Sequence, residues 1–232
     1  MISPGEVISY LDMCREEGMN LQRGMNFKLR KQQSVILMSI RSGAPYADRI
    51  ESDGKVLIYE GHDIPRQQGG GDPKRADQPM VTDGGVYTQN GLFYNAAVKY
   101  KQNGRDPEFV KVYEKIRSGI WVYNGLFKLI DAWQEVSNAR KVFKFKLEII
   151  EPSDVQRHPR FSKNLEHDRL IPTAVKLEVW KRDKGKCVLC GSDDNLHFDH
   201  IIPYSKGGSS LVADNIQLLC ARHNLAKRDR IE

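Results

Sequence analysis

The chain has 232 residues, of which 40% are hydrophobic and 28% are charged, with a formal net charge of +6 at pH 7. This balance excludes a disordered chain and allows one large core or two modest ones. No apolar run reaches the roughly 18 residues of a membrane span, and the first residues lack the order of a signal peptide, so we expect a cytoplasmic protein with no membrane partner. The positive charge favours a polyanionic partner, although an ordinary solvated surface gives the same composition.

The first predicted element is a helix near the amino terminus. Ser3, Pro4 and Glu6 are typical of a helix start, because a hydroxyl cap, a first-turn proline and an acid three residues after the cap suit the free N–H groups there. Gly18 is typical of the residue that follows a helix end. Cys14 lies on the apolar face of this helix, which indicates a small buried side chain rather than a nucleophile.

Strands dominate the next part of the chain. Four segments rich in β-branched and aromatic residues predict strands at 34–40, 55–61, 109–116 and 141–150. A helix is expected near 90–102, and Asn124-Gly125 predicts a tight turn within 120–133. Residues 1–150 are therefore predicted to form an α+β domain built on a curved antiparallel sheet or barrel.

A change in composition separates this domain from the rest of the chain. The stretch 151–172 contains three prolines, mixed charge and little periodicity, which predicts a linker. A helix capped by Thr173 is expected over 173–183. Residues 173–232 then form a second, smaller domain.

The second domain contains two pairs of soft metal ligands. Each pair has a two-residue spacer, and the four residues are Cys187, Cys190, Cys220 and His223. Thiolates with an imidazole are the ligand set that zinc prefers over magnesium or calcium, and such spacing lets both members of a pair reach one ion. The sequence therefore predicts a structural zinc site that holds this short segment folded.

A further set of polar residues accompanies the zinc ligands. It reads Asp199-His200-Ile-Ile-Pro203, then Lys206-Gly207-Gly208, Asn215 and, directly after the last zinc ligand, Asn224. This arrangement resembles the HNH nuclease family over about 173–232, whose ββα-metal fold joins two short strands to a helix around a divalent ion. The resemblance implies that His200 is the general base, that Asp199 and Asn224 hold the catalytic metal, and that Asn215 is the middle asparagine.

The residue types suit phosphodiester hydrolysis. An imidazole can deprotonate water near neutral pH, and a hard ion such as Mg²⁺ or Mn²⁺ on oxygen ligands can stabilise charge on the phosphate. Two alternatives stay open at this point. His223 rather than Asn224 is a candidate for the last catalytic-metal position, and Asp199 with His200 would also suit a carboxylate–imidazole pair serving zinc in a non-catalytic recognition finger.

The amino-terminal part carries a second resemblance. SIRSGAPYADRI…KVLIYEGHD (39–63), DQPMVTDGG…NGLFYNAAVKY (77–100) and VYEKIRSGIWVYNGLFKLIDAWQE (112–135) resemble the SET- and RING-associated (SRA, or YDG) domain, with Asn124 in place of the aspartate. That family reads modified cytosine in duplex DNA by flipping the base out. The resemblance implies that Tyr46 and Tyr59 stack on the base and that Asp48 accepts its amino hydrogen, while Glu60 is a second candidate for the base edge.

Basic residues near both regions are candidates for phosphate contacts. They are Arg23, Lys28, Arg30 and Lys31 in the first domain and Lys206 and Lys227 in the second. An ordinary solvated surface remains the alternative interpretation of each of them.

Together these features favour a modification-dependent DNA endonuclease of the prokaryotic cytoplasm, in which an SRA-like domain captures 5-methyl- or 5-hydroxymethylcytosine and an HNH domain hydrolyses the backbone. A homodimer is expected, because one base and one ion cut one strand at a time. Two alternatives remain: an HNH endonuclease that reads unmodified sequence or shape, and a non-catalytic zinc protein that binds DNA.

Overall fold

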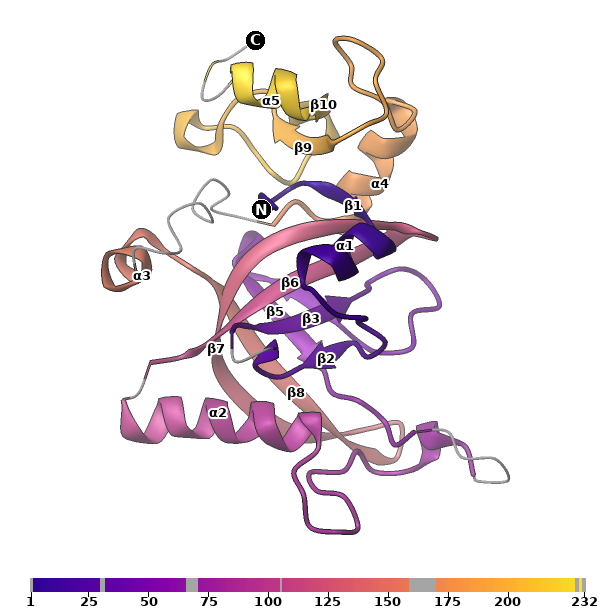
Figure 1. Ribbon diagram of the computed structural model, residues 1–232, viewed down its shortest axis with the longest axis vertical. Helices are drawn as coiled ribbons and strands as arrows, with labels where there is room; N and C mark the ends of the chain where they lie inside the picture. Colours follow the sequence, from indigo (N-terminus) through magenta and orange to yellow (C-terminus); the bar gives the residue numbers. More distant parts are fainter. Residues whose placement is uncertain are drawn as a thin grey trace.

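A curved eight-stranded sheet organises the computed structural model, which describes residues 2–29, 32–65, 71–104, 106–158, 170–227 and 230 (Figure 1). The strands are β1 (Val7–Ser9), β2 (Met25–Asn26), β3 (Ser34–Met38), β4 (Arg49–Glu51), β5 (Val56–Glu60), β6 (Glu108–Arg117), β7 (Ile120–Ser137) and β8 (Arg140–Ile149). Their order is β2-β3-β6-β7-β8-β5-β4, with β1 paired to β7. The pairing of β3 with β6 is parallel and the others are antiparallel. Within the described residues the path is open at β2 and β4, so the sheet is not a closed barrel.

Alternating side chains bury one face of the sheet under a helix. Phe143, Phe145 and Leu147 of β8 are each 0% exposed and belong to the main core. Helix α2 (Gln89–Asn103) packs on this core through Phe93 and Ala97. The helix begins where Thr88 caps it by accepting a hydrogen bond from Gly91, and it ends at Gly104, whose φ of +58° suits glycine. The predicted α+β architecture is confirmed.

The tight turn predicted at Asn124-Gly125 is wrong. Strand β7 continues through both residues for 18 residues. Gly125 has a φ of +98°, and the register with β6 shifts here, because Gly125 faces Val112 while Tyr123 faces Tyr113. Asn124-Gly125 instead forms a β-bulge. A bulge and a tight hairpin turn both need a residue with positive φ, which glycine adopts readily, so the two cannot be distinguished from this sequence pair.

The first helix starts later than the sequence predicts. Helix α1 spans Tyr10–Glu16 and is capped by the Ser9 side chain, which accepts from Asp12 N–H. The residues ahead of it form β1, and Gly5 N–H donates to the carbonyl of Tyr123 at 2.8 Å. The expected start at Ser3 is wrong because backbone bonding to β7 outweighs the local capping pattern. Cys14 is partly buried.

The carboxy-terminal part has the predicted ββα arrangement. It contains α4 (Thr173–Arg182), β9 (Leu196–His200), β10 (Ile216–Cys220) and α5 (Ala221–Lys227), and a short α3 (Pro152–Arg157) precedes it. Strands β9 and β10 form an antiparallel pair. Short 3-10 helices lie at Ser52–Gly54, Pro73–Arg75, Tyr204–Lys206 and Ala213–Asn215. No helix of the described residues is both long enough and apolar enough to cross a membrane.

The amino-terminal segment lies between the large sheet and the β9–β10 hairpin (Figure 1). On one side β1 pairs with β7. On the other side Phe198 N–H donates to the carbonyl of Gly5 at 3.0 Å, and Glu6 forms an isolated bridge with His197. One extended segment thus binds the backbones of both sheets.

A shared core joins the two parts. Ile116 and Val122 of the large sheet belong to the same buried cluster as Val179 of α4 and Phe198 of β9. Undocking the carboxy-terminal part would expose this apolar surface to water, which is unfavourable in proportion to the area exposed.

A buried ion pair crosses the same junction. Lys176 Nζ of α4 lies 2.6 Å from Glu114 Oε2 of β6, and the two residues are 2% and 0% exposed. Asn124 donates to Glu114 at 2.9 Å and accepts from Lys176 at 2.7 Å. Thr173 donates its hydroxyl to Glu114 and does not cap α4, whose first turn follows Pro172, so the predicted cap is wrong. Burial alone raises the pKa of Glu114, but the Lys176 charge and these hydrogen bonds outweigh it and lower that pKa.

Removing one partner of this pair should destabilise the protein strongly. We expect Lys176→Ala to lower the free energy of unfolding by about 3–5 kcal/mol, because Glu114 is left as a buried unpaired charge. The double variant Glu114→Gln/Lys176→Met should recover most of this loss, since the introduced amide can still accept from Asn124 and can donate to the Thr173 hydroxyl. Urea unfolding of the zinc-loaded chain measures both values. A loss below about 1 kcal/mol for Lys176→Ala would show that water reaches Glu114.

Candidate functional site

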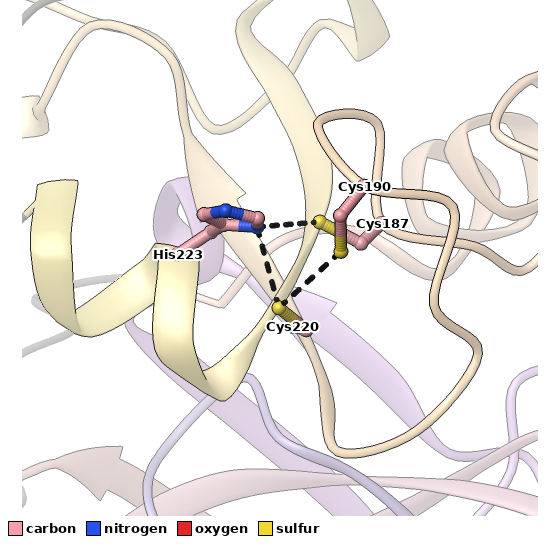
Figure 2. A group of neighbouring side chains, drawn as sticks. All are labelled: Cys187, Cys190, Cys220 and His223. Carbon is pink, nitrogen blue, oxygen red and sulfur yellow. Dashed lines mark hydrogen bonds between the residues drawn. The ribbon is translucent and has the colours of Figure 1, made fainter.

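Four predicted zinc ligands meet beside the β9–β10 hairpin (Figure 2). Cys187 and Cys190 lie in the loop after α4, Cys220 ends β10, and His223 lies in the first turn of α5. His223 Nδ1 is 3.3 Å from Cys187 Sγ and 3.4 Å from Cys220 Sγ, and the Cys190 and Cys220 sulfurs are 3.8 Å apart. All four ligand atoms lie within 4.8 Å of one another.

These distances fit a tetrahedral zinc ion. Zn–S bonds of about 2.3 Å place two sulfurs roughly 3.8 Å apart. Burial raises the pKa of the Cys187 thiol, but hydrogen bonds from the Cys220 backbone and the His223 ring outweigh it and bring that pKa to about 6. The thiolate that zinc requires is thus accessible at neutral pH. The cluster groups the His223 ring with the three thiols.

The other HNH-type residues lie at the end of β9. His200 Nε2 contacts Ser210 Oγ at 2.8 Å, and Ser210 is 2% exposed. Asp199 Oδ2 lies 2.8 Å from Lys227 Nζ of α5, and the same ammonium donates to the carbonyl of His200. Asn224 is half-buried on α5 between His223 and Lys227. Ser210 was not found from the sequence, because two serines after two glycines are typical of an ordinary loop.

Lys227 does not have the predicted role. Its side chain is 1% exposed and pairs with Asp199, so the assignment to a DNA phosphate is wrong. The lysine instead ties α5 to β9 and orients the Asp199 carboxylate. A carboxylate has two oxygens with several acceptor positions, so this pairing leaves capacity for a metal ion. Lys206, by contrast, is exposed at the end of a 3-10 helix.

Asn215 holds the loop that joins the two strands. Its side chain accepts from Ile202 N–H at 2.9 Å and donates to the carbonyls of Ile202 and Ser209 at 3.0 Å each. Gly208 is required here, since a Cβ would lie 1.8 Å from the Ile202 carbonyl oxygen and 2.7 Å from Asn215 Nδ2. Asn215 therefore positions the loop that carries Ser210 to His200.

A cavity of about 940 Å³ opens in the amino-terminal part. Tyr46, Asp48 and Tyr59, three of the four predicted base-pocket residues, line it together with Arg23 and His62. Tyr46 is partly buried and Tyr59 is 1% exposed. The His62 ring stacks on Tyr46 with centroids 5.8 Å apart, and His62 Nε2 lies 3.3 Å from the Tyr59 hydroxyl. His62 was missed because nothing in its local sequence separates it from an ordinary loop histidine.

Asp48 presents a buried carboxylate at this cavity. It accepts hydrogen bonds from the N–H groups of Glu60 at 3.0 Å and Ser39 at 3.2 Å, and it is 8% exposed. Burial raises the pKa of Asp48 to about 7, because removal of water penalises the charged form more than the two hydrogen bonds favour it. The acid can therefore change protonation state near neutral pH.

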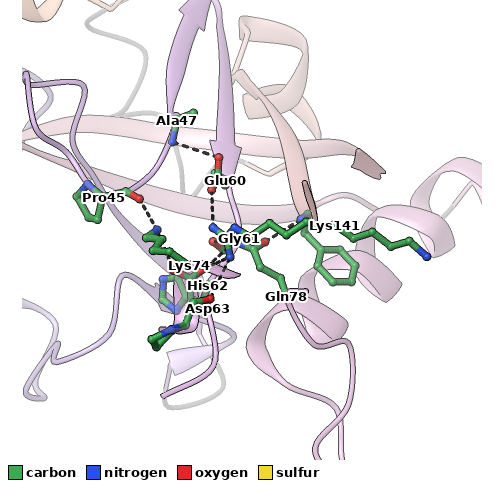
Figure 3. A network of polar contacts seen from close by, with 12 residues as sticks. Pro45, Ala47, Glu60, Gly61, His62, Asp63, Lys74, Gln78 and Lys141 are labelled. Carbon is green, nitrogen blue, oxygen red and sulfur yellow. Dashed lines mark hydrogen bonds and ion pairs between the residues drawn. The ribbon is translucent and has the colours of Figure 1, made fainter. Parts of the chain in front are cut away.

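Glu60 lies outside the cavity and does not have the predicted role. It is 4% exposed, and its carboxylate is held by Lys144 at 2.8 Å and Arg140 at 3.4 Å. Glu60 also accepts a hydrogen bond at 3.2 Å from the N–H of Ala47, the residue between Tyr46 and Asp48 in the sequence (Figure 3). Lys74 holds the same segment from another side, because its ammonium donates to the carbonyl of Pro45 and lies 3.9 Å from the centroid of the Tyr46 ring. Glu60 therefore positions the segment that carries Tyr46 and Asp48.

The remaining basic residues divide into two groups. Arg23 and Lys28 are exposed, and the Lys28 ammonium also lies 3.6 Å from Glu108. Arg30 and Lys31 lie outside the described residues.

Comparisons with known proteins find similarities in both parts of the chain. Residues 187–230 match the model of the HNH endonuclease family. The histone-lysine N-methyltransferase family member SUVH2 of Arabidopsis thaliana is 26% identical over 215 residues, covering 82% of this chain and 31% of the relative, and SUVH9 of the same plant is 27% identical over 136 residues, covering 56% and 19%. The chain thus spans less than a third of the length of these curated relatives.

Similar solved structures include the SRA domain of SUVH5 in complex with methylated DNA, at 24% identity and a TM-score of 0.44, covering 64% of this chain and 89% of that one. Another is ScoMcrA, a type IV phosphorothioation-dependent restriction endonuclease, at 14% identity and a TM-score of 0.44, covering 98% of this chain and 56% of that one. Over residues 187–230 the chain is thus similar to the HNH endonuclease family.

Proposed function

We propose that this protein is a modification-dependent DNA endonuclease, which captures 5-methyl- or 5-hydroxymethylcytosine in its amino-terminal cavity and hydrolyses the backbone with its HNH region. The observation that carries the proposal is that Tyr46, Asp48 and Tyr59 line one cavity of a chain whose residues 187–230 match HNH endonucleases. Its natural setting would be the prokaryotic cytoplasm, and a homodimer would cut both strands.

The reading step uses the shape and polarity of the cavity. A flipped base loses its stacking partners in the duplex, and the rings of Tyr46 and Tyr59 would replace them once the His62 ring, which stacks on Tyr46, moves aside. The Asp48 carboxylate would accept the amino hydrogen of cytosine. Because the backbone N–H groups of Ser39 and Glu60 hold this carboxylate in place, it would meet the base without reorganising.

The cutting step uses the residues at the end of β9. His200 would take a proton from the attacking water, and Ser210 would orient its ring through the 2.8 Å contact to Nε2. Asp199 and Asn224 would hold a Mg²⁺ or Mn²⁺ ion, which when bound supplies positive charge at the scissile phosphate. Lys227 would keep the Asp199 carboxylate aimed at that position.

Matched duplexes test the proposal directly. Pure protein with Mg²⁺ or Mn²⁺ is incubated with unmodified, methylated and hydroxymethylated duplexes of one sequence, and the products are mapped. We expect cleavage of one or both modified duplexes alone. Equal cleavage of all three would favour an HNH endonuclease that reads unmodified DNA, and tight binding without cleavage would favour the non-catalytic zinc protein.

The nuclease residues should separate into two classes. We expect His200→Ala to slow cleavage by about 10²–10⁴-fold while zinc content and DNA affinity stay unchanged, because only proton transfer is lost. Cys220→Ala should instead lose zinc and unfold the carboxy-terminal part. Single-turnover rates, metal analysis and circular dichroism measure these effects. Rapid cleavage by His200→Ala would remove the general-base assignment.

The cavity residues should control discrimination rather than overall affinity. We expect Asp48→Ala to weaken binding to modified DNA by about 1–3 kcal/mol while binding to unmodified DNA barely changes, since the phosphate contacts remain. Tyr46→Ala should act in the same direction through lost stacking. Lys28→Ala is the control and should weaken both duplexes together. An unchanged ratio of modified to unmodified affinity for Asp48→Ala, at fixed salt, would place the reading pocket elsewhere.

The raised pKa of Asp48 should also appear in stability. The folded state holds this proton up to pH about 7, whereas an ordinary aspartate releases it near 3.8, so the Asp48 contribution to stability falls as pH rises between these values. Between pH 5 and pH 8 we expect wild type to lose about 2–3 kcal/mol relative to Asp48→Asn. Urea unfolding of both proteins at the two pH values measures this difference. Parallel pH profiles would mean that Asp48 ionises normally.

A further inference from the structure

We propose that docking of α4 and the β9–β10 hairpin on the large sheet sets the distance between the captured base and the cut. Lys176 determines this cleavage distance, because its ion pair with Glu114 stabilises the contact between α4 and the large sheet. The inference rests on the proposed function and adds the position of cleavage to it.

The chain is anchored to the sheet immediately before α4. Leu170 N–H donates to the carbonyl of Gly54 at 3.0 Å, and Leu170 belongs to the main core of the sheet. Gly54 has a φ of +90°, and a Cβ there would lie only 2.5 Å from the Leu170 carbonyl oxygen. Ile171 belongs to the core shared with the hairpin. The connection from the first domain is therefore already fixed where α4 begins.

The amino-terminal segment provides a second and independent anchor. Tyr123 accepts from Gly5 and donates to Glu6, at 2.8 and 3.0 Å, and Gly5 in turn accepts from Phe198 at 3.0 Å. These backbone bonds connect β7 to β9, the strand that carries Asp199 and His200. A rotation of the hairpin relative to the sheet would break them.

The buried ion pair makes the docked arrangement specific. Glu114 is 0% exposed and lies in the sheet, so in the docked state its charge is compensated by Lys176, with hydrogen bonds from Asn124 and Thr173. Without Lys176 the docked state would contain an unpaired buried charge, whereas an undocked state would let water solvate Glu114. Loss of Lys176 therefore shifts the equilibrium toward undocking.

The size of the effect on cleavage follows from chain statistics. If undocking released all of 151–172, including α3 and the Leu170 anchor, a flexible chain of that length would have a root-mean-square span of at most roughly 25 Å, which corresponds to about seven base pairs of duplex. A tethered nuclease would then cut over a range of that order around the captured base. The docked nuclease has no such freedom, and its cuts should fall at one principal distance.

The test maps cut positions on a duplex with a single modified cytosine, using the zinc-loaded full chain and Mg²⁺ or Mn²⁺. We expect wild type to produce ends concentrated at one distance from that base. Lys176→Ala should move most ends away from this position and spread them over several base pairs, while zinc content and affinity for the modified duplex are unchanged. Faster hydrogen exchange of the α4 amides would show that the junction has loosened.

Three variants serve as controls. Lys181→Ala removes an exposed lysine from the same helix and should keep the wild-type position. Glu114→Gln/Lys176→Met removes the same ammonium without leaving a buried charge, and it should keep that position too. If Lys176→Ala does not fold, Thr173→Val removes only one hydroxyl donor to Glu114 and should broaden the ends to a smaller extent.

The possible failures are distinguishable. Scattered cuts by wild type on modified DNA would overturn this inference and leave the proposed function intact. The same holds if Lys176→Ala, with faster exchange in α4, still cuts at the wild-type position. Absence of any preference for modified DNA in wild type would overturn the proposed function, and the inference with it.

Discussion

The pairing of Glu114 with Lys176 is the constraint on which the arrangement of the two parts depends. A fully buried carboxylate is tolerated only beside groups that compensate its charge, so β6 can carry Glu114 only if α4 lies against it. The pairing also explains Asn124, which stands where the SRA signature has aspartate. An asparagine can donate to Glu114 and accept from Lys176 at once, whereas a second carboxylate would repel the first.

Charge compensation also organises the cavity. Asp48 and Glu60 are both buried acids, but Glu60 is paired with Lys144 and Arg140 while Asp48, within the described residues, accepts hydrogen bonds from two backbone N–H groups and forms no ion pair. Glu60 has a structural role, because its negative charge is compensated by the side chains of Lys144 and Arg140. Burial raises the pKa of Asp48 to about 7, and its carboxyl group faces the cavity, where a ligand can complete its environment.

The sequence by itself determined the features that depend on residues close together in the chain. The spacing of Cys187 and Cys190, and of Cys220 and His223, places each pair within reach of one ion whatever the rest of the fold does. The alternating residues of β8 are likewise local, because the strand period acts over a few residues, whereas the ββα arrangement of the carboxy-terminal part was implied by the resemblance to HNH nucleases.

Tertiary structure decided the features that depend on distant partners. Residues 3–6 carry a good helix start, yet they bond to β7, which lies more than a hundred residues away. The sequence predicted Lys227 to be a surface cation, but its side chain is buried against Asp199. It also predicted Glu60 to be a pocket acid, but the Glu60 carboxylate is paired with Lys144. The physical reason is the same in each case. A local sequence pattern indicates which kinds of group a residue can bond. Which of these groups lies within bonding distance depends on the packed fold.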